Sequence, residues 1–390
     1  MSTPRATGDS AAWAIAIAGL IALAAAIGVG RFAFTPLLPM MQHDRGLSIT
    51  AGGWLASANY LGYFAGAISA VWLHMPAATM LRIALALNAL LIAGMGVTDS
   101  LAAWLTIRIA AGVVSAWVFV FASTVVLRRL ADFGRIELSS VMFAGVGIGM
   151  VLPGVMCIAF VAYGISAQDA WLSFAVIAAI AAVAVWPAFD TARQAADAQS
   201  FAARRQPQWT STMACLIASY GLFGFGYIIP ATFLPVFARD MLAGSQAYVW
   251  FWPACGVAAA ISVILSVRWS QRYGDYALLI ACCLAEAVGI VLPVWAPRAA
   301  TIALSAVLLG ATFIVITVAS LREARRLAPQ HAGSLIAAMT SSFALGQIAG
   351  PIIAAYLVAW RGNFDFSLIM AAIALLGAAA LLPKSARAEN

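Results

Sequence analysis

The sequence predicts an all-α integral membrane protein of twelve transmembrane helices, arranged as two pseudo-symmetric bundles of six. Three observations predict this fold: the composition, an internal repeat and the distribution of basic residues. Of the 390 residues, 64% are hydrophobic and only 9% are charged, against about 25% charged in typical soluble domains. The apolar runs reach about 20 residues, which is long enough to cross a bilayer. They do not alternate polar with apolar residues, so helices are expected rather than a barrel.

The internal repeat has an offset of 196 residues, half the length of the chain. Gly28-Val29-Gly30-Arg31, with Pro39 downstream, recurs as Gly224-Phe225-Gly226-Tyr227 with Pro235 downstream. We therefore expect an N-terminal six-helix bundle over residues 1–188, a polar cytoplasmic linker over 189–209 and a C-terminal six-helix bundle over 210–390. Repeats of this parallel kind are typical of transporters in which one half rocks against the other.

The predicted spans follow one another with short connections. In the first half they cover residues 12–39, 50–73, 79–98, 101–127, 138–163 and 170–188. In the second half they cover residues 210–237, 246–267, 276–296, 299–321, 333–358 and 365–383.

The basic residues predict the orientation of these spans. Fifteen of the 21 lie in segments on the same side as the N-terminus, four lie in segments on the other side, and Arg31 and Arg108 lie within spans. Basic residues collect on the cytoplasmic side, so both termini are expected there. We expect a multi-pass protein of the cytoplasmic (inner) membrane, whose net charge of +7 reflects topology rather than nucleic-acid binding.

The remaining composition argues against an enzyme. The five cysteines all fall within spans, without the spacing of a metal site or a disulfide framework. The few polar residues form no catalytic group. We expect no catalytic residue, cofactor or metal, and a monomer whose partners are a small-molecule substrate, membrane lipid and protons.

Three charged residues lie well inside predicted spans, away from their ends, namely Arg31, Arg108 and Glu286. Such charges cost about 2.5–3.5 kcal/mol on insertion scales and mark candidate functional sites. A rise of about 1.5 Å per residue puts both arginines about 10–12 Å below the outer surface. The same count puts Asn59 and Tyr227 at nearly that level.

A resemblance to a known family follows from two longer motifs. They are Gly30-Arg31-Phe32-Ala33-Phe34-Thr35-Pro36-Leu37-Leu38-Pro39-Met40-Met41 and Gly53-Trp54-Leu55-Ala56-Ser57-Ala58-Asn59-Tyr60-Leu61-Gly62-Tyr63. Both resemble the YbfB/YjiJ-type branch of the major facilitator superfamily, and the similarity extends over nearly the whole chain. The resemblance implies that helices 1, 4, 7 and 10 line a central cavity, which places Arg31, Arg108 and Tyr227 around it. The signature loop between helices 2 and 3 is degraded here, and a better remnant, Arg272-Tyr273-Gly274-Asp275, follows helix 8.

Two arginines without an acid at matching depth favour an anionic substrate such as a carboxylate, held by bidentate hydrogen bonds. The candidate substrate-binding residues are Arg31, Thr35, Asn59, Tyr63, Arg108, Tyr220, Tyr227, Thr312 and Gln347. Each has a structural alternative. Arg31 could bond carbonyls freed where Pro36 and Pro39 disrupt the helix, Arg108 could serve packing or gating, and Thr312 and Gln347 could each bond a neighbouring helix.

Glu286 is the one acid well inside a predicted span. A buried carboxyl could carry a coupling proton. The resemblance instead places its helix at the periphery, where a protonated glutamate packed between helices is the favoured reading.

Small residues four apart allow helices to approach closely, and several prolines accompany them. The candidate packing or gating positions are Gly28, Gly30, Gly112, Gly145, Gly149, Pro153, Gly224, Gly226, Gly346, Gly350 and Pro351.

The function expected from these residues and the resemblance is secondary active transport of a small molecule by alternating access, with an organic anion as the favoured substrate and protons as a candidate coupling ion. Two alternatives stay open. One is an efflux pump for drugs or metabolites of other charge, and the other is a transporter-derived membrane sensor.

Overall fold

The structure is a computed structural model that describes residues 4–70, 72–73, 75–189, 209–242, 249–329 and 332–382. Its first span consists of α1 (Pro4–Leu23), a π-helical turn η1 (Ala24–Val29) and α2 (Phe34–Arg45). The N-terminal half, residues 4–189, continues with α3 (Ile49–Ser69), α4 (Ala77–Val97), α5 (Leu101–Asp132), η2 (Ile136–Leu138), α6 (Ser139–Ala162), α7 (Ala167–Val185) and η3 (Trp186–Phe189). The C-terminal half, residues 209–382, contains α8 (Ser211–Met241), α9 (Phe251–Tyr273), α10 (Asp275–Trp295), α11 (Ala299–Leu327), α12 (Ala332–Arg361) and α13 (Asp365–Leu381).

These elements confirm the all-α fold and the twelve predicted spans, with the first span broken in two. Within the described residues, ten helical segments are long and apolar enough to cross a membrane. The other two spans are α3, which is diluted by glycine, serine, asparagine and tyrosine, and α13, which is 17 residues long. Residues 190–208, nearly all of the predicted linker, lie outside the described part of the chain.

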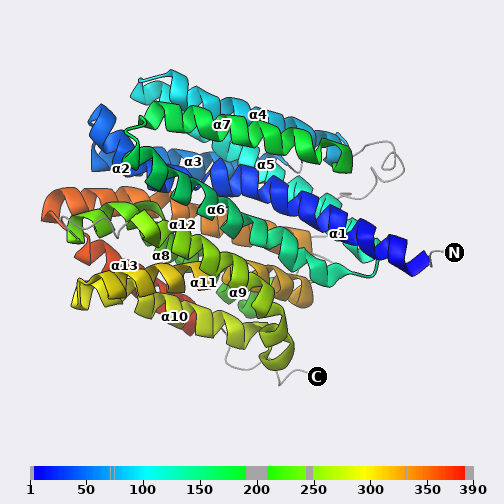
Figure 1. Cartoon of the computed structure of the whole chain (residues 1–390). Helices are drawn as coiled ribbons and strands as arrows, with labels where there is room; N and C mark the ends of the chain where they lie inside the picture. Colours follow the sequence, from blue (N-terminus) through cyan, green and yellow to red (C-terminus); the bar gives the residue numbers. More distant parts are fainter. Residues whose placement is uncertain are drawn as a thin grey trace.

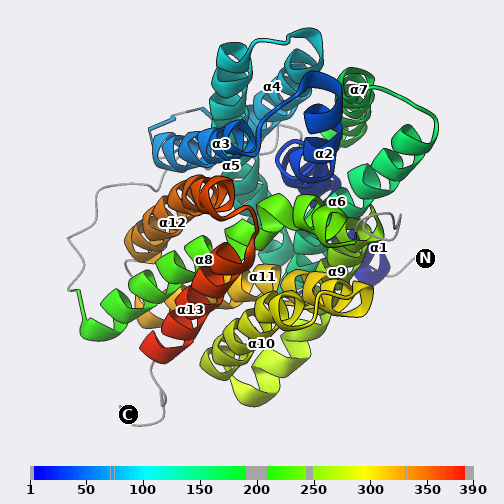
Figure 2. The ribbon, with the colours of Figure 1, turned by 90° about the vertical axis from the view of Figure 1, so that its left-hand side faces the viewer.

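The two halves lie side by side with their helices running broadly in the same direction (Figure 1). They meet along two seams, α3 against α12 and α6 against α9, and α2 also packs against α8 (Figure 2). Glycines allow close contact at both seams. A Cβ on Gly53 would lie 2.8 Å from the carbonyl oxygen of Pro351, and a Cβ on Gly147 would lie 2.5 Å from the oxygen of Gly256. The helices therefore meet backbone to backbone, as small residues permit in lipid.

Side-chain hydrogen bonds between the halves reinforce these seams. The Thr35 hydroxyl donates to the carbonyl oxygen of Ala231 at 2.9 Å, and the Ser57 hydroxyl donates to that of Ile348 at 2.8 Å. At the far end of α2 and α8, Arg239 donates to the side-chain oxygen of Gln42 at 3.2 Å. These bonds extend from the middle of the helices to the end where α2 terminates, and they hold the halves together there.

Thr35 and Ala231 are 196 residues apart, the offset of the sequence repeat. Equivalent positions of two repeats can touch only near the axis that relates them. The pseudo-twofold axis therefore passes beside this contact, four residues along the chain from Arg31.

Candidate functional site

The site is organised around the break in the first span. In η1 the amide of Gly30 donates to the carbonyl oxygen of Ala25 at 2.9 Å, five residues back, and Phe32 donates to Ile27 at 3.1 Å. The chain then turns, and α2 begins at Phe34. Proline is tolerated in the first turn of a helix, where its missing N–H would have no partner, so Pro36 suits a new helix starting here. The break leaves Arg31 between two helical segments.

Arg31 is 5% exposed, and its guanidinium carbon lies 4.5 Å from the ring centre of Tyr63, 4.8 Å from that of Tyr60 and 5.4 Å from that of Phe32. Its Nε and Nη2 atoms have no hydrogen-bond partner within the described residues. Contacts of this kind stabilise a desolvated cation by about 2 kcal/mol, but they leave hydrogen-bond donors unused. These two nitrogens therefore do not bond the carbonyls freed by the prolines, which was the structural alternative for Arg31.

Arg108 lies in a different environment. It is buried in α5, its Nε donates to the carbonyl oxygen of Leu55 in α3 at 3.3 Å, and its guanidinium covers the ring of Phe34 at 4.7 Å. Asn59 in α3 donates through Nδ2 to the main-chain oxygen of Arg108 at 3.0 Å. These bonds tie α3 to α5 and brace the wall behind the first span.

The C-terminal half contributes a stack of aromatic rings. Tyr227 in α8 is nearly parallel to Phe313 in α11, with ring centres 5.8 Å apart, and nearly parallel to Phe343 in α12 at 5.6 Å. Tyr220, two turns earlier in α8, stacks on the same Phe343 at 4.7 Å. Phe223 lies between the two tyrosines, 4.9 Å from Tyr227 and 5.7 Å from Tyr220. We call Tyr220, Phe223, Tyr227, Phe313 and Phe343 the aromatic stack.

Gln347 in α12 is fully buried beside this stack and donates through Nε2 to the hydroxyl of Tyr227. Its Oε1 atom has no partner among the residues described, and the same holds for Oδ1 of Asn59. Buried side-chain polar atoms are nearly always hydrogen-bonded. Two free acceptors therefore accompany the free donors of Arg31.

The break and the aromatic stack meet at the boundary between the halves. Phe32 contacts Phe313 edge-on at 6.0 Å and Trp252 of α9 at 6.1 Å. The hydroxyls of Tyr60 and Thr232 lie 3.3 Å apart across the same boundary. Arg31, the tyrosines under it and the aromatic stack thus form one continuous cluster, which we call the central site.

Five of the nine predicted substrate-binding residues belong to the central site or touch it: Arg31, Tyr63, Tyr220, Tyr227 and Gln347. The hydroxyl of Thr35 is instead bonded to the Ala231 carbonyl of the other half. Asn59 and Arg108 lie in the wall behind it. Residue types alone did not indicate Tyr60, Phe223, Trp252, Phe313 or Phe343, because an apolar ring in a membrane span is ordinary packing; the proximity of Tyr60 to Asn59 and Tyr63 in the motif was the nearest signal.

The ninth residue, Thr312, points away toward Glu286. Its Oγ1 lies 2.7 Å from Oε2 of Glu286 in α10 and 2.7 Å from the carbonyl oxygen of Leu308. Glu286 is fully buried, and its Oε1 has no partner in the described part of the chain. The pair lies between α10 and α11, one residue along α11 from Phe313 of the aromatic stack.

The predicted packing positions lie where backbones approach. A Cβ on Gly28 would come within 2.3 Å of Cα of Gly149. The other glycines face a main-chain oxygen or a side chain of a neighbouring helix at similar range: Gly30, Gly112, Gly145, Gly224, Gly226, Gly346 and Gly350. Pro153 is buried within α6, and Pro351 of α12 supplies the carbonyl that faces Gly53.

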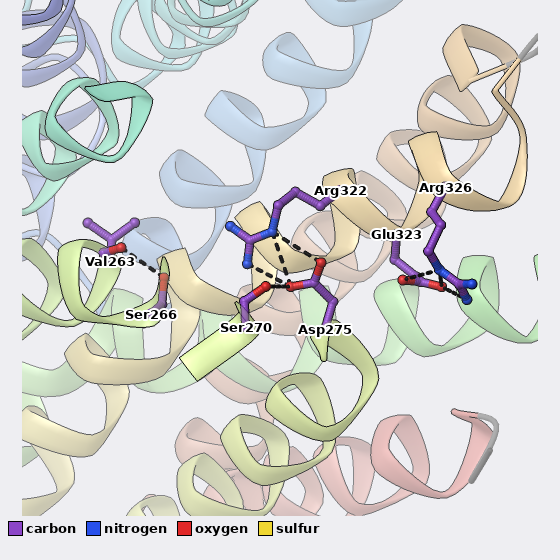
Figure 3. A network of polar contacts seen from close by, with 7 residues as sticks. All are labelled: Val263, Ser266, Ser270, Asp275, Arg322, Glu323 and Arg326. Carbon is purple, nitrogen blue, oxygen red and sulfur yellow. Dashed lines mark hydrogen bonds and ion pairs between the residues drawn. The ribbon is translucent and has the colours of Figure 1, made fainter. Parts of the chain in front are cut away.

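The remnant signature that ends at Asp275 forms a polar network (Figure 3). Both carboxylate oxygens of Asp275 accept from Nε of Arg322 in α11 at 3.1 Å, and Ser270 of α9 donates to Oδ1 at 2.7 Å. One turn further along α11, Arg326 donates from Nε to Glu323 at 2.8 Å. This network joins α9, α10 and α11 at the end of the molecule opposite Gln42 and Arg239.

Comparison with known proteins agrees with this architecture. A family described as "Uncharacterised MFS-type transporter YbfB" matches residues 23–383. Crystal structures of the nucleoside transporter NupG superpose with TM-scores of 0.70 and, for a point mutant, 0.72. Both are 16% identical, and they cover 94–95% of this chain and 98–99% of theirs. No curated protein matches the chain. With its residues 23–383 matched by that family and its fold shared with NupG, the chain is a multi-pass membrane transporter of the major facilitator superfamily, in the YbfB-type family.

Proposed function

We propose that this protein is a secondary active transporter that carries a small organic anion, a carboxylate with a flat apolar part, across the cytoplasmic membrane by alternating access. One observation carries the proposal: a buried guanidinium with two unused donor nitrogens lies at the boundary between the halves. No carboxylate is among the partners described for it. A substrate anion would supply the missing acceptors, and hydrogen bonds to a charged group contribute about 1.5–3 kcal/mol each.

The aromatic stack supports the shape of the substrate. The rings of Phe313 and Phe343 each lie within 9° of parallel to that of Tyr227, so the C-terminal half presents flat apolar surfaces opposite the arginine. Contacts between ring faces add about 0.5–1.5 kcal/mol beyond area burial. The free oxygen atom of Gln347 would accept from a hydroxyl or amide group of the substrate.

The bonds between the halves support alternating access. Charge distribution predicts that α2 and α8 end on the outer side, with both termini cytoplasmic. In that orientation, the bonds at Thr35, Ser57 and Gln42 hold the outer side closed, and the network at Asp275 lies on the cytoplasmic side. A monomer suffices for this motion, because both halves belong to one chain.

A nucleoside is the second candidate substrate. NupG, whose solved structures share this fold, is a nucleoside transporter, and an aromatic stack beside the free amide oxygen of Gln347 suits a nucleobase. Arg31 favours the anion, because a neutral nucleoside would leave the guanidinium charge uncompensated. The same charge disfavours export of cationic drugs.

Glu286 supports protons as the coupling ion. The Thr312 hydroxyl has one hydrogen but lies 2.7 Å from both Glu286 and the Leu308 carbonyl. A carboxylate and a carbonyl are both acceptors, so one contact would lack a hydrogen. Both are satisfied if Glu286 is protonated and donates to Thr312, which then donates to Leu308. We assign the proton to Glu286 in this state, next to a helix that carries part of the central site.

A thermal-shift screen of the purified protein tests the substrate class. The panel contains carboxylates paired with their own amides, such as benzoate with benzamide, together with nucleosides and cationic drugs. We expect stabilisation by at least one carboxylate and not by its amide. Stabilisation by nucleosides or cations, with no carboxylate exceeding its amide, would overturn the anion proposal.

A further inference from the structure

Asn88 of α4 holds the π-helical turn that precedes Arg31. It is almost fully buried, and its Nδ2 donates to the carbonyl oxygen of Ala25 at 3.2 Å. That oxygen already accepts from the amide of Gly30, five residues ahead. A π-helical turn is rare and occurs mostly as a single turn at functional sites. Here a side chain from another helix donates to the same carbonyl oxygen that accepts one of the wide hydrogen bonds of the turn.

The surroundings leave the turn little freedom. A Cβ on Gly30 would come within 2.3 Å of Oδ1 of Asn88, so the asparagine lies directly against the backbone that leads into Arg31. On another side, Gly28 lies against Gly149 of α6. The turn is therefore held between α4 and α6, with Asn88 as the polar contact. The Oδ1 atom has no partner within the described residues, so the Nδ2 group alone accounts for the hydrogen bonding of this side chain there.

The direction of Arg31 depends on this turn. A π-helical turn holds one residue more than the α-helix it replaces, and each residue of an α-helix rotates the chain by about 100°. Conversion of η1 to regular α-helix would therefore rotate the following residues by about that angle. The Arg31 guanidinium would then leave its position over Tyr60 and Tyr63.

The second repeat provides an internal comparison. Its counterpart of the broken span, α8, is helical from Ser211 to Met241 without a π-helical turn. The residue 196 positions after Asn88 is Leu284, whose side chain is 43% exposed. In the C-terminal half, where Tyr227 replaces Arg31, the counterparts of Asn88 and of the π-helical turn are thus both missing.

We propose that Asn88 is a positioning residue: by holding η1 in its π-helical form it aims Arg31 into the central site, and so sets the preference of that site for an anion. The inference rests on the proposed function for the identity of the ligand. Its structural part, the hold of Asn88 on η1, is independent of any ligand.

The test compares wild type with Asn88→Leu, which keeps the volume of the side chain and removes its donor. Hydrogen exchange measured on the peptide over residues 24–33 should quicken by about tenfold, as expected when one buried hydrogen bond is lost. The ratio of benzoate to benzamide affinity should fall by about tenfold or more, because a misdirected guanidinium loses a charge-assisted bond. In an Arg31→Met background, Asn88→Leu should change that ratio no further, since coupled residues are non-additive.

Ser219→Ala is the matched control. Ser219 of α8 is buried and donates to the carbonyl oxygen of Ala378 in α13 at 2.8 Å, so its loss removes a comparable bond in the other half. We expect it to leave exchange over residues 24–33 and the benzoate to benzamide ratio unchanged.

Wild-type exchange over residues 24–33 in Asn88→Leu would overturn the inference, as would an equal fall of the affinity ratio with and without Arg31. A different outcome separates the two proposals. If exchange quickens but wild type fails to prefer any carboxylate over its amide, the proposed substrate is contradicted and the hold of Asn88 on η1 is supported.

Discussion

Replacing Arg31 by methionine separates a binding role from a bracing role without any knowledge of the substrate. A bracing arginine stabilises the folded protein, so its loss lowers stability. A binding arginine is kept unpaired for its ligand, so the ligand-free protein gains little from it. Arg31 has two donors without partners in the described structure and is 5% exposed. We therefore expect it to behave as a binding arginine, whose loss does not lower the stability of the ligand-free protein.

The cost of burying the Arg31 charge and the stabilisation from its ring contacts are of similar size in the ligand-free protein. Burial of an ion without a paired charge costs several kcal/mol. Three ring contacts at 4.5–5.4 Å return about 0.5–2 kcal/mol each. Methionine removes both contributions and fills a similar volume, and such replacements of buried charges are often neutral or stabilising. We expect the stability of ligand-free Arg31→Met to equal or exceed that of wild type.

Arg108→Met is the matched control, because Arg108 is equally buried but donates to Leu55 and covers Phe34. Its loss removes a hydrogen bond made by a charged donor, which costs about 1.5–3 kcal/mol. The midpoint should fall by roughly 2–4 °C per kcal/mol, the value for domains of 150–250 residues. Thermal unfolding in detergent measures both variants. If the unfolding midpoint of Arg31→Met falls as far as that of Arg108→Met, Arg31 is a brace and the reasoning fails.

Three further predictions concern other contacts. Glu286→Gln keeps a partner for Thr312 but removes the proton site, so accumulation driven by a pH gradient should disappear while substrate exchange continues; unchanged accumulation would exclude Glu286. Gly28→Ala puts a Cβ 2.3 Å from the Gly149 backbone and should lower the unfolding free energy by about 1–3 kcal/mol, measured by thermal unfolding; wild-type stability would contradict the backbone contact. Ser57→Ala removes a bond between the halves worth about 1 kcal/mol, so spin labels on α2 and α8 should report a larger separated population, and an unchanged distribution would count against the bond as a clamp.

The spans, and the depth of the polar residues within them, were predictable from sequence because each depends on local properties. Apolar length marks a span, and prolines and glycines mark the break near Arg31. Depth follows from residue counts, and Asn59 and Arg108, which that count places at one level, are joined by a hydrogen bond in the structure. The internal repeat predicted the two halves, and the structure adds that equivalent positions, Thr35 and Ala231, meet across their boundary.

Other features depend on side-chain direction, which residue counts do not supply. Arg31 and Arg108 look alike in sequence, yet one keeps two free donors and the other bonds a carbonyl. Phe313 and Phe343 are typical apolar residues of a span until packing stacks them on Tyr227. Asn88 was visible as a polar residue in a span, but its contact with Ala25 requires the π-helical turn, which no periodicity in the sequence indicates.

The central claim is that Arg31 binds the transported anion. Its most direct test is counterflow in proteoliposomes, in which a labelled carboxylate found by the thermal-shift screen exchanges against the same unlabelled compound. Wild type should exchange it, and Arg31→Met should lose at least about a hundredfold in apparent affinity, as expected when two charge-assisted hydrogen bonds are removed. Counterflow by Arg31→Met with wild-type affinity would contradict the account.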